Sequence, residues 1–121
     1  MYDPDLADRM EDIDPQFRAL LREHITTFIR WDILRFFVET NRESAPLDEI
    51  AAAVGREPAA LLAESADLVR AGFLGRRTVE GTTHYVITQE RRRRAQLETF
   101  LTATHDREFR LKVIYHLLHP D

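Results

Sequence analysis

Cysteine is absent from this chain of 121 residues, which excludes disulfides, thiolate metal sites and thiol catalysis. The four glycines form no phosphate-binding loop, and neither an HExxH pair nor a serine in a nucleophile elbow is present, so we expect no enzyme and no catalytic residues. No apolar run approaches the roughly 18 residues of a membrane span, and the N-terminus is acidic rather than signal-like. We therefore expect a cytoplasmic protein without membrane contact.

The chain has no excess of positive charge, because 17 basic residues stand against 21 acidic ones and the net charge is −4, which is not the strongly basic balance of a typical nucleic-acid-binding domain. Six acids and one arginine fall within residues 1–14, so the remaining residues carry a net charge of about +1. This acidic stretch is poor in apolar residues and predicts a flexible arm. Residues 15–121 are long enough for one domain with its own buried core.

Two short amphipathic helices joined by a tight turn are predicted within residues 46–74. Apolar residues recur at i, i+3, i+4 and i+7 from Leu47 to Val54, which indicates one helical face. Gly55 then suits a left-handed position at the helix end, and Pro58 suits the first turn of the next helix. The pattern is that of a helix-turn-helix.

A β-hairpin is predicted directly after this motif, because two β-rich runs flank a polar turn that contains Gly81. Helices followed by a hairpin define a winged helix. We predict a mainly α fold with a small β-hairpin, a winged helix-turn-helix with extra N- and C-terminal helices. Its parts are the helix-turn-helix at 46–74, the wing at 75–87 and the C-terminal helices at 88–119.

The stretch from about Trp31 to Thr88 resembles the winged helix-turn-helix domains of the ArsR and MarR families of bacterial transcriptional regulators. WDILRFFVE is similar to their first core helix, LDEIAAAVG to their second, LVRAGFL to the end of their recognition helix and GRRTVEGTTHYVIT to their wing. The resemblance implies a dimeric regulator whose second motif helix enters the major groove of double-stranded DNA. The wing would then lie along the backbone or in the minor groove.

Candidate DNA-binding residues follow from that resemblance and lie on the outward side of the second helix and on the wing. They are Arg56, Ala59, Ala60, Ala63, Arg76, Arg77, Thr82, Thr83 and His84. The second helix departs from the resembled families, which usually carry Ser, Thr, Gln, Arg and Lys at these positions. Residues 47–68 instead hold five acids and one arginine, and we expect outward-facing Glu64 and Asp67 to be repelled by phosphates. Neutralising these two acids should then strengthen binding.

That acidic, alanine-rich helix leaves an alternative function open. The chain would then be a winged-helix protein-interaction module that has lost DNA binding. Partners on either hypothesis include a second copy of the chain, with double-stranded DNA on the first and another protein on the alternative.

The dimer is predicted from the first and last helices. Residues 15–41 carry a continuous helical stripe after Asp14, and either one bent helix or two helices jointed near Thr26 and Thr27 would fit. The last helix, about Asp106 to Leu118, is apolar on most sides and needs two packing partners, of which one would be a second copy. The candidate interface residues are Phe17, Leu21, Phe28, Phe109, Val113, Ile114 and Leu117.

The intervening segments are assigned more simply. Residues 41–45 are predicted to be a polar linker, and Thr88 is predicted to cap a helix that runs to about Ala103. Residues 91–94 are four consecutive arginines, which point all round a helix and so predict a solvated face with salt bridges rather than one patch.

Three histidines near the C-terminus suggest a further alternative. His105, His116 and His119 are similar in spacing to the zinc site on the last helix of ArsR-type metal sensors, which implies a metal- or small-ligand-responsive regulator. A small ligand would then lie among the aromatics of the dimer helices. However, Ala103 replaces the aspartate of that pattern, and a helix separates it from the wing. We therefore expect no metal and no cofactor.

Overall fold

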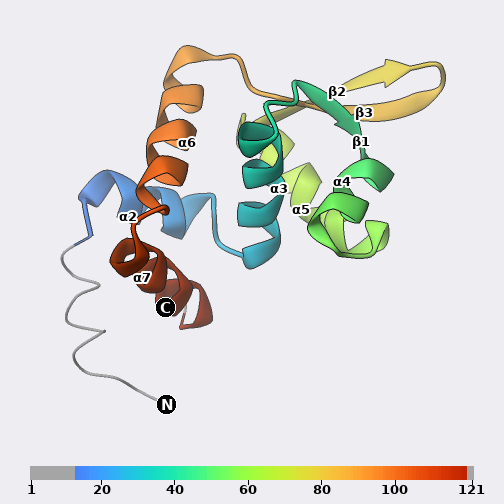
Figure 1. The fold of residues 1–121 in the computed structure, drawn as a ribbon. Coiled ribbons are helices and arrows are strands. Elements are labelled where there is room, and N and C mark those ends of the chain that lie inside the picture. The colour runs from blue at the N-terminus through green and yellow to red at the C-terminus, as the bar shows by residue number, and fades with distance from the viewer. Residues whose placement is uncertain (1–12, 120–121) are drawn as a thin grey trace.

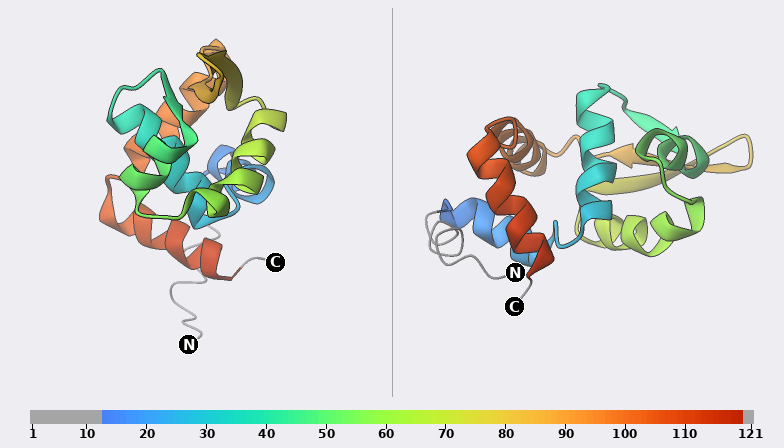
Figure 2. Two further views of the ribbon diagram at one scale, coloured as in Figure 1. Left: turned by 90° about the vertical axis from the view of Figure 1, so that its right-hand side faces the viewer. Right: turned by 60° about the horizontal axis from the view of Figure 1, so that its bottom comes forward.

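The computed structural model describes residues 13–119, which form a helical fold with one small antiparallel sheet (Figure 1). Its elements are, in chain order, α2 (Pro15–Glu23), α3 (Phe28–Glu39), β1 (Ser44–Pro46), α4 (Leu47–Val54), α5 (Pro58–Arg70), β2 (Leu74–Val79), β3 (Thr82–Ile87), α6 (Arg91–Ala103) and α7 (Arg107–Leu118). Figure 2 shows α2, α6 and α7 gathered on one side of α3, with α4, α5 and the sheet on the other. The predicted winged helix with additional helices at both ends is confirmed.

Of the two alternatives that the sequence left open, the structure shows two separate helices, with the joint just before Phe28 and thus near Thr26 and Thr27. Asp14 caps α2 by accepting a hydrogen bond from the Gln16 amide at 2.9 Å. The Thr27 hydroxyl accepts from the Arg30 amide at 3.1 Å and so caps α3. A threonine at this position satisfies an otherwise unpaired amide of the first helical turn, which explains why the stripe is divided here.

The helix-turn-helix lies where the sequence places it. Gly55 ends α4 with φ of 73°, a left-handed conformation that glycine adopts with little strain. Pro58 begins α5, where its missing amide hydrogen would have had no helical acceptor.

The wing is a two-stranded hairpin extended to three strands. Glu80 and Gly81 form its two-residue turn with φ of 50° and 80°, as the tight turns of twisted hairpins require. The third strand, β1, pairs antiparallel with β3 and places Ala45 opposite Tyr85, which gives the order β1-β3-β2. The prediction of a linker at 41–45 was therefore wrong for Ser44 and Ala45. Three residues are too few to show an alternating pattern, and only β3 gives them a partner.

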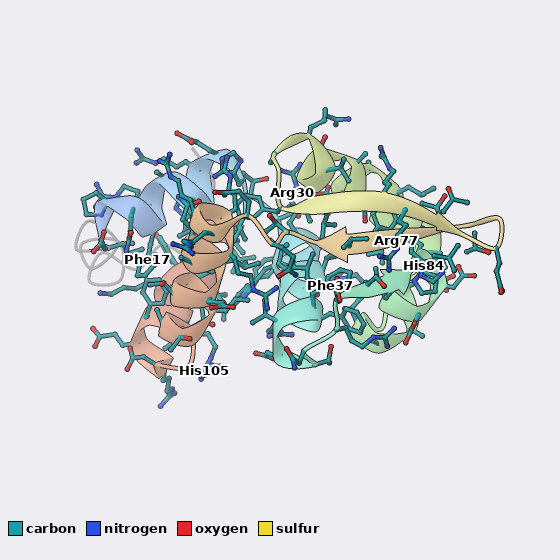
Figure 3. The ribbon with its side chains drawn as sticks, turned by 90° about the horizontal axis from the view of Figure 1, so that it is seen from above. Phe17, Arg30, Phe37, Arg77, His84 and His105 are labelled. Atoms are coloured by element: carbon teal, nitrogen blue, oxygen red, sulfur yellow. The ribbon has the colours of Figure 1, made fainter. Side chains whose placement is uncertain are left out.

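The core runs through both groups of helices. Phe37, Phe73 and Phe100 are its largest fully buried side chains. Phe17, labelled in Figure 3, joins the terminal helices. Its ring lies 5.9 Å from that of Phe100 on α6 and 5.2 Å from that of Phe109 on α7. Most of the predicted acidic arm, residues 1–12, lies outside the described residues. Ile13, which the predicted arm included, is 4% exposed and belongs to the core. The predicted arm therefore extends too far along the chain.

The C-terminal helices begin at acidic caps. Glu90, not the predicted Thr88, caps α6 by accepting from the amides of Arg92 and Arg93 at 3.1 and 2.8 Å. These hydrogen bonds to the charged carboxylate lower the pKa of Glu90. Asp106 caps α7 by accepting from the Phe109 amide at 2.9 Å, as the predicted helix boundary implies. Among residues 13–119 no helix is long and apolar enough to cross a membrane.

Candidate nucleic-acid interface

Helix α5 buries one side and exposes the opposite side along its length. Leu61, Ser65 and Leu68 are each 0% exposed and face the domain core. The candidate DNA-binding residues Ala59, Ala60 and Ala63 are exposed on the other side of the helix. Leu62 lies beside them and is 54% exposed, although it was not among the candidates. The outward position of Leu62 could have been derived from the sequence, because it follows the inward-facing Leu61 at an angle of about 100° around the helix.

The two acids of α5 do not belong to that exposed surface. Arg30 on α3 reaches Glu64 through Nε and Asp67 through Nη2, each at 2.5 Å. The Thr27 hydroxyl donates to Glu64 at 3.1 Å, and a third nitrogen of Arg30 donates to the carbonyl oxygen of His24 at 3.1 Å. The interpretation that Glu64 and Asp67 face the groove as unpaired charges was wrong. They lie on the flank of α5 that packs against α3.

A second arginine outside the motif compensates another of its acids. Arg42 binds Glu49 through both terminal nitrogens, with an Nη2–Oε2 distance of 3.0 Å. This hydrogen bonding lowers the pKa of Glu49 and raises that of Arg42. Counting Arg30 and Arg42 with residues 47–68 changes the net charge of the motif from −4 to −2. The charge of a sequence window therefore overstated the acidity of the folded motif.

Arg56, the candidate cation at the start of α5, is also engaged. Its Nε and Nη2 atoms lie 3.2 and 3.0 Å from one carboxylate oxygen of Asp32 on α3. Arg35 approaches the other oxygen of Asp32 at 3.3 Å. The side chain of Arg56 is 35% exposed, so its charge is shared with α3 and only partly available to a ligand.

The wing presents its two arginines to opposite faces. Arg76 pairs in register with Tyr85, and its guanidinium carbon lies 6.0 Å from the centre of that buried ring. Arg77 pairs in register with His84, near which it lies in Figure 3, and donates from Nη2 to the Ser44 hydroxyl at 3.0 Å. Successive residues of a strand point to opposite sides. The adjacent pair is therefore two separate cations, one on the helix-covered side of the sheet and one on its outer side.

The remaining wing candidates lie near the tip and along β3. Thr82 and Thr83 are exposed and follow the turn at Glu80 and Gly81, whereas His84 is half-buried between its neighbours in β1 and β2. The structure thus brings the wing candidates together on one hairpin beside α5. Their contact with DNA stays a prediction.

The dimer candidates are mostly engaged within one chain. Leu21, Val113 and Leu117 are at most 8% exposed and belong to the protomer core. The other four, namely Phe17, Phe28, Phe109 and Ile114, are partly buried and pack against that core. The exposed apolar side chains of α7 are instead Leu111 at 44% and Leu118 at 61%, which the sequence interpretation did not select. The expected surplus of apolar surface is reduced because α2 and α6 cover much of α7.

A polar cleft of about 610 Å³ lies between α2 and the start of α6. Glu23 and His24 line one wall, and Arg92 and Arg93 line the other. The guanidinium carbon of Arg93 lies 4.8 Å above the ring of Phe73, and the His24 ring meets the same ring edge-on at 5.4 Å. Burial, and next the charge of Arg93, lower the pKa of His24. This lining is polar and differs from the aromatic pocket expected for a ligand-responsive regulator.

The arginine run and the C-terminal histidines make ordinary surface contacts. Arg94 binds Glu98 at 2.6 Å, while Arg91 and Arg92 are exposed, so the run forms no single patch, as predicted. His105 lies 3.9 Å from Glu39. Within residues 13–119 no group of three or more histidine, cysteine, aspartate or glutamate side chains is placed to hold a metal ion.

Comparison with known proteins identifies the class of fold. No protein-family model matches the chain, and no curated protein matches its sequence. Solved structures do match, among them the AntR antimony-specific transcriptional repressor, with a TM-score of 0.57 and 20% identity over 87% of this chain and 94% of that one. A transcriptional regulator homologue from Pyrococcus horikoshii OT3 gives 0.54 and 20%, over 74% and 97% of the two chains. A possible transcriptional regulator from Methanosarcina mazei Go1 gives 0.55 and 12%, over 75% and 80%. The chain therefore has a winged-helix fold similar to that of transcriptional regulators.

Proposed function

We propose that the chain is a DNA-binding transcriptional regulator that acts as a homodimer. The observation that carries this proposal is the capture of Glu64 and Asp67 by Arg30, because it removes the strongest electrostatic objection to placing α5 against DNA. No acid between Pro58 and Arg70 remains unpaired, so the helix can approach phosphates with a nearly neutral surface. The regulators that share the fold support the same function.

The favourable charge would come from the edges of this surface. Arg76 and Arg77 on the wing are exposed, and Arg70 at the end of α5 is 71% exposed while it pairs with Asp67. Arginines contact phosphates without regard to sequence, and the hydroxyls of Thr82 and Thr83 add donors of the kind that fix a protein on the backbone. In this arrangement the wing supplies affinity and α5 lies in the groove.

The dimer would form through the exposed side of α7. Leu111 and Leu118 recur at i and i+7 and so share one exposed face, with the partly buried Ile114 at its edge and the buried Val113 on the other side of the helix. Two such helices packed about a two-fold axis would bury these side chains. Symmetry would then place two wings and two α5 helices on one duplex, as in other two-fold helix-turn-helix dimers.

The test is a titration of a fluorescein-labelled, mixed-sequence duplex with the full chain, followed by anisotropy at several salt concentrations between 50 and 200 mM. We expect binding whose affinity falls steeply with salt, because counterions are released when arginines meet phosphates. Absence of any salt-dependent binding at the lowest salt concentration would contradict the proposed function.

A further inference from the structure

We propose that α5 selects duplexes by contacting thymine methyl groups in the major groove rather than by hydrogen bonding to base edges. The inference rests on the proposed function and concerns the same surface. It is anchored on Leu62, the large apolar side chain that projects from the exposed side of α5 with 54% of its surface open.

Between Pro58 and Asp67, the side chains of this helix that could read bases by hydrogen bonding are engaged elsewhere or buried. Glu64 and Asp67 are held by Arg30, and Ser65 is 0% exposed on the core side. Arg56, just before the helix, uses Nε and Nη2 on Asp32. Reading a base edge with any of these groups would require breaking an ion pair or turning the helix over.

The exposed positions in the first two turns of α5 offer only apolar contact. Around Leu62 lie the exposed methyl groups of Ala59, Ala60 and Ala63, which have neither donors nor acceptors. In the major groove the thymine methyl is the largest apolar feature of a base edge, and the G·C edge consists of hydrogen-bonding groups apart from the small C5–H of cytosine. Leu62 against a guanine or cytosine edge would desolvate polar atoms without replacing their hydrogen bonds. Leu62 against thymine would bury apolar surface on both partners.

The charges around Leu62 favour a duplex over a protein as the occupant. Arg70 ends the same helix and Arg76 and Arg77 lie on the hairpin that follows it, so the elements that carry and follow the apolar positions also carry exposed cations. A duplex presents both features together, with phosphates along the edges of a groove and methyl groups on its floor. We therefore assign this surface to A·T-containing duplex DNA with several thymines exposed in one stretch of major groove.

The experiment compares two duplexes of the same A·T-rich sequence, one with thymine and one with deoxyuridine throughout. They differ only in the 5-methyl group, so charge and hydrogen-bonding pattern are constant. We expect the uracil duplex to bind about fourfold more weakly for each methyl contacted. Placing 5-methylcytosine in a G·C-rich duplex restores a methyl group in the groove and should strengthen binding to that duplex.

Two variants locate the effect on the protein. Leu62→Ala should bring the ratio of the two affinities toward one, and its exposed position should leave the circular dichroism spectrum unchanged. Arg77→Ala should weaken binding to both duplexes by the same factor and leave the ratio intact, because its contact would be with phosphate.

The outcomes separate the two proposals. Equal, salt-dependent binding to the thymine and uracil duplexes would overturn methyl readout and leave the proposed function standing. Absence of salt-dependent binding to either duplex would overturn both, and the surface around Leu62 would then be a docking site for a protein. The ratio of the affinities of the unsubstituted chain for the thymine and uracil duplexes tests methyl readout even if Leu62→Ala fails to fold.

Discussion

Arg30 and Glu64 join α3 to α5 through an Nε–Oε2 contact of 2.5 Å, with side chains that are only 15% and 21% exposed. The partners are 34 residues apart in the sequence, so the contact depends on the tertiary fold. It fixes the flank of α5 against α3 and leaves the opposite side of the helix free. The orientation of the candidate reading surface therefore depends on a charge pair outside that surface.

Arg30→Ala should lower the free energy of unfolding by about 1 to 3 kcal/mol, because the partly buried Glu64 would lose its cation and Asp67 would keep only the exposed Arg70. Urea denaturation followed by circular dichroism measures the change. Arg91→Ala, which removes an exposed arginine at the start of α6, is the matched control and should change stability by less than about 0.5 kcal/mol. Equal effects of the two substitutions would contradict a structural role for the Arg30 contact.

Glu64→Gln combined with Asp67→Asn should destabilise the protein and should not strengthen its binding to DNA. The acids neutralise Arg30 in a partly buried position, so their removal leaves that charge without its partners. Urea denaturation and duplex titration on the same preparation measure both quantities. Tighter DNA binding at unchanged stability would restore the hypothesis that these acids face the groove.

His24 should make stability depend on pH between about 7 and 5. Burial lowers its pKa in the folded chain, so the unfolded chain takes up a proton first as the pH falls. The contribution is fully present above the unfolded pKa near 6.5 and is lost as the pH falls through and below that value. Carboxylates such as Glu49 and Glu90, whose pKa values are lowered, act only below about pH 4.5 and leave this window clear.

Urea midpoints at pH 7.5 and 5.5 test this dependence. The His24→Phe variant keeps a ring beside Phe73 and should show a smaller decrease between the two pH values than the unsubstituted chain. His105→Gln, at a side chain that is 69% exposed, is the control and should retain the full decrease. An unchanged decrease in His24→Phe would assign the pH dependence to other groups.

The dimer proposal separates exposed from buried positions on α7. Leu111→Glu with Leu118→Glu should yield a folded monomer of about half the mass, because both side chains are exposed in the protomer. Val113→Glu should instead unfold the chain, since an unpaired charge at a position that is 0% exposed costs several kcal/mol. Sedimentation equilibrium with circular dichroism distinguishes the two. A concentration-independent monomer of the unsubstituted chain, 14.2 kDa, would contradict the dimer.

Local signals made most of the fold predictable from sequence. Gly55 ends α4 and Pro58 begins α5, and both effects depend on the backbone conformation of the residue itself, so they can be read from the local sequence. By contrast, β1 is three residues long and exists only because β3 pairs with it, so no local pattern reveals it. Thr88 was predicted as the cap because threonine is a common capping residue, whereas the helix begins at Arg91 and its cap is Glu90, so the boundary was placed two residues too early.

The candidate site was less predictable because its ion pairs join residues that are far apart in the sequence and meet only in the folded chain. The net charge of residues 47–68 could be counted from sequence, but the pairing of Glu64 with Arg30 and of Glu49 with Arg42 could not. The opposite orientation of Arg76 and Arg77, by contrast, could have been derived from the predicted β-strand, because successive side chains alternate between its two faces. A charge count within a motif thus describes composition, whereas its surface potential depends on arginines from neighbouring elements.

The central claim is that the protein binds duplex DNA with α5 and the wing, and that the wing arginines contact the phosphates. The most direct test compares the salt dependence of duplex affinity for three proteins: the unsubstituted chain, Arg76→Ala with Arg77→Ala, and Arg91→Ala with Arg92→Ala. The last pair removes the same charge from the start of α6, away from the wing (Figure 1). We predict that the wing variant lowers the slope of log affinity against log salt by about two to four for the dimer, depending on whether one or both arginines of each wing reach phosphate, while the α6 variant leaves the slope unchanged. Equal slopes for all three proteins would contradict the account.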